Sequence, residues 1–319
     1  MTKQKIAITG AAGNLGSLLA HRLLKEDVSL NLLIHKKEVD EDLRASHNTS
    51  IFPIDLADKG SIVSSLEGVD TIVHFAGVLF KANPEKFLPT TNTVYFQNLL
   101  EIAVQQKVKR VILISFPHVE GESFPSNPAK GSLKGNPISM HAKTRLEEEK
   151  LLFEYGKQFS FQAVSLRVGM VYGKDILMND AALWFARHYL LGVWKKDTQI
   201  HLISKTDFQD ATAMACLKPN IEGIYHIGDD GVQSLQKFLD TITTYKGYKK
   251  PWRMPVWMIM TAARFFELWS KVFNTQSPLT VDFIKIGMVS YYGDTTRMKK
   301  ELLSELKYKN FEEGLCLFD

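Results

Sequence analysis

Short runs of apolar residues alternate with helical patterns through the first half of the chain. Strand patterns lie at Lys5–Thr9, Leu30–His35, Ile51–Ile54, Thr71–Phe75, Val111–Ser115 and Gln162–Val168. Helical patterns lie between them, at Leu15–Lys25, Ser61–Leu66, Thr91–Gln106 and Ser139–Tyr155. Strands that alternate with helices in this way predict a parallel sheet with helices on both faces. Right-handed crossovers then give an α/β fold with a Rossmann-type doubly wound sheet.

The pattern becomes less regular after about Gly173. Helical patterns follow at Ala181–Leu191 and Leu235–Thr244, and strand patterns at Ile200–Ile203 and Ile224–Ile227. We expect a larger Rossmann domain over residues 1–172, to which residues 204–228 return, and a smaller substrate-binding lobe over residues 173–319. The segment Gly121–Pro137 is rich in glycine and proline, so it is expected to be a mobile loop.

A glycine-rich segment follows the first strand pattern and opens the first helical pattern. It reads Thr9-Gly10-Ala11-Ala12-Gly13-Asn14-Leu15-Gly16. Glycines let a backbone approach a pyrophosphate closely, and a helix amino terminus offers free N–H groups and a positive dipole end. This context between a strand and a helix predicts a dinucleotide site that includes Thr9, Gly10, Ala12, Gly13, Asn14, Leu15 and Gly16.

The end of the second strand pattern bears on which dinucleotide binds. A carboxylate there is typical of NAD sites, whereas a basic group accommodates the 2′-phosphate of NADP. Here the strand ends in His35, Lys36 and Lys37, and the first carboxylate is Glu38. We therefore predict NADP as the preferred cofactor, with NAD as the alternative. The other interpretation of Lys36 and Lys37 is that they are solvated surface residues without a role in binding.

Composition and charge exclude several classes. With 45% hydrophobic and 23% charged residues, the chain is not disordered or fibrous, and a net charge of +4 without like-charge runs does not indicate nucleic-acid binding. The two cysteines and scattered histidines show no metal-binding spacing. Neither a secretory signal nor an apolar run of about 18 residues is seen, so a cytoplasmic protein is expected.

The ordered series of motifs resembles the extended short-chain dehydrogenase/reductases, the family of NAD(P)-dependent sugar epimerases and dehydratases. Besides the glycine loop, it includes Asp55-Leu56, His74-Phe75-Ala76-Gly77, Thr91-Asn92-Thr93-Val94, Leu166-Arg167-Val168-Gly169-Met170-Val171-Tyr172-Gly173, Gly223–Gly228 and Asp294-Thr295-Thr296-Arg297. The resemblance implies cofactor contacts from Asp55, Leu56, Phe75, Ala76, Gly77, Asn92, Ser115 and Lys143. It also implies a small-molecule substrate and a possible homodimer through the helices of Asn92 and Lys143.

The catalytic pattern of that family is broken. Its members use a Tyr-x-x-x-Lys pair, in which the lysine holds the nicotinamide ribose and lowers the pKa of the tyrosine. Lys143 is present, but Ser139 stands at the tyrosine position and Phe116 at a substrate-orienting Ser or Thr position. Loss of a general acid typically costs about 10²–10⁴ in rate, so the usual alcohol–ketone mechanism is in doubt.

Three functions remain open. The first is a reductase or epimerase-like enzyme that takes its proton from His118, or from His141 or Tyr172; His141 is about 200° around the helix from Ser139 and should point elsewhere. A Ser139–Lys143 nucleophile pair is a variant of this enzyme. The second is a non-catalytic NADP sensor. The third is a membrane-associated reductase of a lipid-like substrate.

The third function depends on the segment from Val256 to Asn274, where a narrow polar stripe separates many large apolar residues. Packing inside the second lobe or at a subunit contact is the structural explanation, and a lipid substrate or an interfacial helix is the functional one. Trp184–Trp194 is expected to pack the second lobe. The acidic run Glu147–Lys150 is expected to be a solvated helix face.

Overall fold

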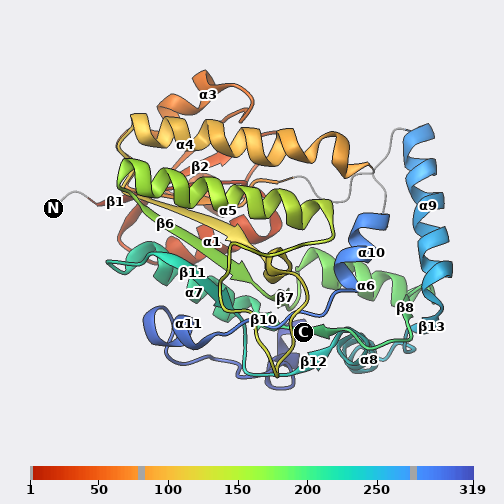
Figure 1. Ribbon diagram of the computed structural model, residues 1–319. Coiled ribbons are helices and arrows are strands. Elements are labelled where there is room, and N and C mark those ends of the chain that lie inside the picture. Colours follow the sequence, from red (N-terminus) through yellow and green to blue (C-terminus); the bar gives the residue numbers. More distant parts are fainter. Residues whose placement is uncertain (1–2, 78–82, 274–278) are drawn as a thin grey trace.

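A computed structural model describes residues 3–77, 83–273 and 279–319. Its centre is a seven-stranded parallel sheet in the order β11-β6-β5-β4-β1-β2-β3 (Figure 1). These strands are β1 (Gln4–Thr9), β2 (Val28–Ile34), β3 (Thr49–Pro53), β4 (Thr71–His74), β5 (Arg110–Ser115), β6 (Gln162–Val168) and β11 (Gly223–Ile227). The strand order reverses between β1 and β4, and ligands of such sheets bind outside the carboxyl ends of the strands near that point.

Helices cover both faces of the sheet, as expected for parallel strands that are buried on both sides. On one face lie α1 (Asn14–Leu23), α7 (Lys205–Leu217) and α11 (Thr296–Glu301), and on the other lie α3 (Lys59–Val63), α4 (Tyr95–Gln105) and α5 (Met140–Phe159) (Figure 1). A short helix, α2 (Glu41–Ala45), precedes β3. Each face has its own apolar core, one centred on Ile8 and Leu19 and the other on Ile72 and Phe96.

A third apolar core lies in the second part of the chain, around Trp194, Phe238 and Phe311. It is built from α6 (Leu177–Arg187), α8 (Leu235–Tyr245), α9 (Val256–Phe273), α10 (Val281–Gly287), β7 (Met170–Tyr172), β8 (Gly192–Trp194), β9 (Gln199–Ile200), β10 (Leu202–Ser204), β12 (Gln233–Ser234) and β13 (Trp252–Met254). These strands form three two-stranded pairs, β10–β7, β12–β9 and β13–β8. The segment 204–228 supplies α7 and β11 to the large sheet.

The predicted sheet is confirmed, with shifts of one or two residues at most strand ends and a seventh strand contributed by residues 223–227. The helix predicted at Thr91–Gln106 begins with a π-helical turn, Pro89–Val94, before α4. The described residues contain no helix that is long and apolar enough to cross a membrane.

One expectation about side chains is wrong. Glu148 and Glu149 are fully buried, because α5 turns them toward the sheet, and only Glu147 and Lys150 form an exposed pair. The expected packing of α9 inside the second lobe holds for one side of the helix: Ile259 and Ala263 face the core, while Trp257 and Val272 are exposed. A subunit contact at the exposed side stays a prediction. Asn274, the last residue of that predicted stretch, lies outside the described residues.

Candidate active site and cofactor cleft

The glycine loop between β1 and α1 has a conformation that requires glycine. Gly10 has φ +68°, which is the left-handed region, and a Cβ there would lie 3.1 Å from the backbone N of Ala76. A Cβ on Gly13 would lie 2.9 Å from the carbonyl oxygen of Gly10, and one on Gly16 would overlap the same oxygen. The loop therefore packs tightly between the ends of β1 and β4.

The amino terminus of α1 opens into this loop. Its N-cap residue is Gly13, which has no side chain to accept a hydrogen bond from the first turn. Backbone N–H groups of a first turn without a side-chain cap are free to bind an anion. The cradle thus fits the pyrophosphate of a dinucleotide, with Thr9, Ala12 and Leu15 as its remaining predicted residues.

Asn14 uses its side chain in another direction. Its Nδ2 donates to the carbonyl oxygen of Asp175 at 2.6 Å, and its Oδ1 accepts from the backbone N–H of Leu177 at 3.0 Å. The first residue of α1 is therefore fastened to the start of α6. Any contact of Asn14 with a dinucleotide would come from its backbone.

The residues after β2 are exposed. His35, Lys36 and Lys37 are exposed, and His35 Nδ1 lies 3.2 Å from the carbonyl oxygen of Ile54. Glu38 is engaged with Arg44 at 2.7 Å. Among the described residues neither Lys36 nor Lys37 pairs with a carboxylate, so both lysines are compatible with a 2′-phosphate.

The residues after β3 and β4 flank the glycine loop on either side. Asp55 Oδ1 accepts from the backbone of Ala57, and Leu56 packs against one sheet core. The backbone N–H of Ala76 donates to Thr9 Oγ1 at 3.3 Å, and Phe75 packs edge-on against Phe208. The predicted cofactor residues that follow β1, β3 and β4 therefore lie along the edge of the sheet where the strands have their carboxyl ends.

A buried polar cluster beneath this edge was missed by sequence reasoning. Thr9 Oγ1 and His74 Nδ1 are 2.8 Å apart, and Glu148 Oε1 lies 4.0 Å from His74 Nε2. Burial raises the pKa of Glu148 to about 7, and Arg145, 3.0 Å away, opposes this. Burial, assisted by the Arg145 charge, lowers the pKa of His74 well below its ordinary value. His74 is therefore neutral, and it does not form an ion pair with Glu148.

Arg145 connects the buried cluster of His74 and Glu148 with Gly77, one of the predicted cofactor residues after β4. A Cβ on Gly77 would lie 3.2 Å from an Arg145 guanidinium nitrogen. The pattern of α5 could have revealed this, because Arg145 and Glu148 are three residues apart and so share one face of a helix.

Ser115 ends β5 and is buried, and its Oγ has no hydrogen-bond partner among the described residues. Phe116 follows it at the predicted Ser or Thr position. Asn92 is also buried, and its Nδ2 donates to Thr144 Oγ1 of α5 at 3.1 Å. An orphaned hydroxyl at the carboxyl edge of the sheet fits a bound polar group there.

Ser139 and Lys143 differ in how they are engaged. Ser139 is the N-cap of α5, and its Oγ accepts from the backbone N–H of Ala142 at 3.2 Å. Lys143 lies one turn later and is exposed. Among the described residues its ammonium has no hydrogen-bond or ion-pair partner. The serine hydroxyl is thus used in capping, while the lysine remains available to a ligand.

His141 points away from this pair, as its helical position predicts. Its Nδ1 lies 2.6 Å from Asp282 Oδ2 of α10. Burial acts to raise the pKa of Asp282, but hydrogen bonds from His141 and the Met140 backbone outweigh it and lower that pKa. This contact joins α10 to the amino terminus of α5.

His118 lies in a short 3₁₀-helix, Pro117–Glu120, rather than in an exposed loop. Its ring is 4.2 Å from the Tyr291 ring, centroid to centroid, and neither ring nitrogen has a hydrogen-bond partner in the described part of the chain. Burial outweighs the opposing effect of the Ile286 backbone and lowers the pKa of His118 to about 3. The imidazole is therefore neutral near pH 7.

His118 and Ser139 line one cavity of about 290 Å³. The rest of its lining is Gly121, Glu122, Asn136, Ile138, Ala142, Ile286, Met288 and Val289. We call this the His118 cavity. It lies beyond the carboxyl end of β5, at the edge of the sheet that also carries the glycine loop.

Tyr172 is built into the third core instead. It is fully buried against Phe311 and Phe318, and its hydroxyl donates to the carbonyl oxygen of Asn310 at 3.2 Å. Burial raises its pKa strongly. Tyr172 is therefore structural and cannot replace the missing tyrosine.

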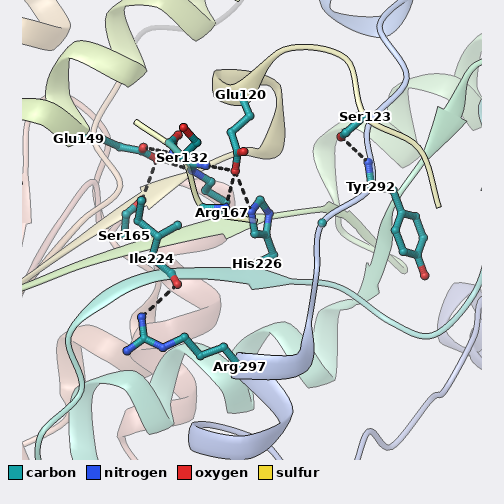
Figure 2. Close-up of polar contacts among 12 residues, drawn as sticks. Glu120, Ser123, Ser132, Glu149, Ser165, Arg167, Ile224, His226, Tyr292 and Arg297 are labelled. Atoms are coloured by element: carbon teal, nitrogen blue, oxygen red, sulfur yellow. Dashed lines mark hydrogen bonds and ion pairs between the residues drawn. The ribbon is translucent and has the colours of Figure 1, made fainter. Parts of the chain in front are cut away.

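A cluster of buried charges fixes the segment between His118 and Ser139 (Figure 2). Arg167, fully buried on β6, pairs with Glu149 of α5 at 2.5 Å and with Glu120. It also donates to the carbonyl oxygen of Ser132 at 2.9 Å. The expected mobile loop is therefore tied to the sheet at its middle.

Glu120 is shared by several donors. Its Oε1 accepts from the backbone N–H of Gly131 at 2.7 Å and from His226 Nε2 at 3.1 Å. Burial acts to raise the pKa of Glu120, but the His226 hydrogen bond and the Arg167 charge outweigh it and lower that pKa. Within the described residues, no group of three His, Cys, Asp or Glu side chains could hold a metal ion.

Comparisons with known proteins agree with this geometry. A sequence model of the NAD dependent epimerase/dehydratase family matches residues 6–216. An uncharacterised protein of Methanocaldococcus jannaschii is 24% identical over 78% of this chain and 83% of its own length. A uronate dehydrogenase of Pseudomonas putida is 26% identical over 57% of this chain and 66% of its own.

The fold has solved relatives. The Thermus thermophilus UDP-glucose 4-epimerase in complex with NAD superposes with a TM-score of 0.76 at 19% identity, over 98% of this chain and 97% of that one. At this identity the likeness concerns the fold.

Proposed function

Because the chain belongs to the NAD dependent epimerase/dehydratase family, we propose that it is a nicotinamide-dependent oxidoreductase acting on a small, largely apolar substrate in the His118 cavity. One observation carries the proposal. The glycine cradle, with Gly10 at φ +68° and the uncapped start of α1, opens at the same edge of the sheet as that cavity. A dinucleotide and a substrate can thus meet at this edge.

The chain's own residues supply binding and orientation. When bound, the nicotinamide would supply or accept a hydride. The exposed ammonium of Lys143 would hold the nicotinamide ribose, and Ser115 Oγ, which has no hydrogen-bond partner among the described residues, would be a further donor to the bound group. Ile138, Ile286 and Met288 would exclude water from the substrate.

His118 would orient the substrate oxygen. A neutral imidazole can donate a hydrogen bond to a carbonyl and polarise it without giving up a full proton. With its pKa near 3, His118 is confined to that role and is not an imidazolium acid. This replaces the polarising part of the lost tyrosine's work. The proton that completes the alcohol after hydride transfer would come from solvent water as the product leaves the cavity.

Dinucleotide binding and turnover test the proposal separately. Protein fluorescence is titrated with NADPH and NADH, and NADPH consumption is then followed with a panel of small apolar ketones and aldehydes. Lys143→Ala should weaken dinucleotide binding about tenfold, as loss of one charged hydrogen bond does, and the exposed Lys157→Ala is the control. Wild-type protein that binds neither dinucleotide at millimolar concentration contradicts the proposal.

The cofactor preference rests on Lys36 and Lys37. If they receive a 2′-phosphate, NADPH binds more tightly than NADH, and Lys36→Ala/Lys37→Ala removes the difference while NADH affinity stays the same. Tighter binding of NADH by the wild type would instead establish NAD as the cofactor.

A second candidate function is a non-catalytic NADP sensor. It is favoured by the capping role of Ser139, which leaves no ionisable acid at the tyrosine position. A sensor binds NADPH with a change in proteolytic protection but consumes none with any substrate of the panel. Turnover that His118→Gln abolishes would exclude it.

We also propose a homodimer through α4 and α5, which lie side by side on one face of the sheet (Figure 1). Val94 and Phe159 are exposed at the ends of these helices and would be covered. Light scattering that gives the mass of one chain would exclude this dimer.

A further inference from the structure

We propose that the outer face of α9 binds the surface of an anionic phospholipid membrane. This face consists of Trp257, Met258, Phe265, Leu268, Trp269 and Val272, and we call it the α9 face. The proposal does not depend on the cofactor or on the chemistry of the cleft. It is carried by the exposure of these residues, by their tryptophan content and by the distribution of charge along the chain.

The α9 face is a continuous apolar stripe on one helix. Trp257, Leu268 and Val272 are 68%, 62% and 67% exposed. They are separated by eleven and four residues, and these spacings place all three side chains on one side of a helix. Phe265 and Trp269 lie beside them, with ring centroids 6.2 Å apart. Contiguous apolar exposure of this kind marks an interaction site.

The stripe is placed for contact with a large flat partner. In Figure 1, α9 stands at one edge of the molecule, on the side opposite to the one where the N-terminus lies. Its inner side is held by Ile259 and Ala263 in the third core, and by Glu267 Oε1, which accepts from the backbone N–H of Val281 at 2.8 Å. The only carboxylate of the helix is thus turned toward the protein.

The segment that precedes α9 extends the surface. Trp252 is 64% exposed, and its indole N–H donates to the carbonyl oxygen of Tyr189 at 3.0 Å. The ammonium of Lys249 lies 5.1 Å from the centroid of the Tyr189 ring. Tryptophan, tyrosine and lysine side chains of this kind are typical of the boundary between lipid headgroups and acyl chains.

Charge identifies the partner. Residues 249–273 contain five Lys or Arg residues and one Glu, a net charge of +4, and the whole chain also carries +4. The remaining 34 basic and 34 acidic residues therefore cancel. All of the chain's excess positive charge lies in the 25 residues that include α9.

Two of the five cations lie on α9 itself, and the other three precede it in the chain. Lys249, Lys250, Arg253, Arg264 and Lys271 are all exposed, and only Arg253 has an ion pair, with Asp240 at 2.8 Å, among the contacts of the described residues. Arg264 and Lys271 are seven residues apart on one flank of α9. Such side chains can reach lipid phosphates while the apolar residues enter the headgroup region.

A second copy of the chain fits less well. It would bring another segment of charge +4 against the first, and like-charge repulsion opposes that contact. An anionic bilayer instead attracts each Lys or Arg side chain near its surface, and burial of the tryptophans adds to that attraction.

Vesicle flotation of the full-length chain tests the proposal. Vesicles of phosphatidylcholine with about 30% phosphatidylglycerol should float the protein, and pure phosphatidylcholine should float at least tenfold less, since the headgroup charge supplies much of the attraction. Binding should fall as salt is raised, and tryptophan emission should shift to the blue. No flotation with the anionic vesicles overturns the proposal.

Two matched pairs of variants locate the contact. Val272→Glu should reduce flotation at least tenfold, whereas Val232→Glu, at a valine that is 57% exposed elsewhere, should leave it unchanged. Arg264→Glu/Lys271→Glu should also reduce it at least tenfold, and Lys25→Glu/Lys157→Glu, with the same change in net charge, should not. Equal losses within either pair overturn the assignment to α9.

Oligomeric state gives the competing outcome. If light scattering shows a dimer that Val272→Glu dissociates and Val232→Glu does not, a second copy covers the α9 face and the membrane proposal is wrong. A mass that is the same for the wild type and both variants, together with flotation, supports it.

Discussion

The glycine loop and the segment from Phe116 to Ser139 border the same edge of the sheet, but different forces fix their shapes. The loop depends on backbone geometry, with Gly10 in a left-handed conformation and α1 starting without a side-chain cap. The segment depends on side chains, above all on Arg167, which joins Glu120 and Glu149 beneath it (Figure 2). The cofactor half and the substrate half of the cleft can therefore change independently.

The comparison also bears on the prediction, drawn from the resemblance, that the glycine loop keeps the family pattern while Phe116 and Ser139 depart from it. A pyrophosphate is bound by backbone N–H groups, so any change at Gly13 or Gly16 meets the carbonyl of Gly10. The side chains of His118 and Ser139 line the His118 cavity, and no backbone contact of the kind seen in the glycine loop fixes which residue types stand there. The chemistry can thus depart from that of the family while the cofactor site remains.

The largest expected effect concerns the charges beneath the substrate segment. Arg167→Met leaves the fully buried Glu149 without its cation, and it should lower the free energy of unfolding by about 3–5 kcal/mol. Urea denaturation followed by circular dichroism measures this. Arg44→Met, which removes an exposed partner of Glu38, should cost less than about 1 kcal/mol. Equal losses in both variants would show that the buried cluster is not what holds the segment.

The next effect concerns the loop. Gly16→Ala places a Cβ against the carbonyl oxygen of Gly10, so the loop must open and dinucleotide binding should weaken about 10- to 100-fold, the cost of one charge-assisted hydrogen bond. Fluorescence titration with NADPH measures it. Gly60→Ala is the control, because a Cβ there meets only the flexible Asp58 side chain, at 3.2 Å. Unchanged affinity in Gly16→Ala would exclude the loop as the phosphate site.

The two halves also differ in how far the sequence predicts them. Glycine spacing between a strand and a helix indicates the loop directly, and alternation of apolar runs predicts the sheet, because both follow from local backbone preferences. The neutral state of His118 and the burial of Glu148 were not predictable in this way. They depend on which distant parts of the chain cover each side chain. His118, for example, is covered by the residues around Ile286 and Tyr291.

The same reason explains the error on α5 and the limit of the prediction for α9. The run Glu147–Lys150 has a solvated composition, but the partners Arg145 and Arg167 make it possible to bury Glu148 and Glu149. The sequence of α9 predicts a helix with a wide apolar surface, yet only the structure tells which side faces the third core. The cytoplasmic location and the division at residue 172 stay predictions.

A smaller effect follows from the pKa of His118. The folded protein holds this group near pKa 3, whereas an unfolded histidine titrates near 6.5. The unfolded state therefore binds more protons between these values, and stability is lost as pH falls from 6.5 toward 3, by up to about 1.4 kcal/mol per pH unit. His118→Gln should flatten the profile by that amount, as urea denaturation between pH 4 and 7 would show.

Another buried histidine acts in the same direction. Burial lowers the pKa of His201 to about 4, so the slope must be compared between variants rather than read from the wild type alone. His47→Gln, at an exposed position, is the matched control and should leave the profile as it is. If both variants have the profile of the wild type, the pKa of His118 is not lowered in the folded protein, and the argument that confines His118 to the neutral form is wrong.

The smallest effect separates structure from chemistry at Ser139. If its hydroxyl serves only to cap α5, Ser139→Ala should lower the free energy of unfolding by about 1 kcal/mol, and Ser139→Asp should restore that stability because a carboxylate also caps a helix. Ser234→Ala, which removes the N-cap of α8, should cost a similar amount without affecting the cleft. Turnover that follows stability through this series assigns Ser139 to the scaffold. Suppose instead that Ser139→Asp is as stable as the wild type and that turnover is lost in both Ser139 variants. The hydroxyl itself is then needed at the substrate. In that case both halves of the cleft have kept a chemical group that acts on a ligand.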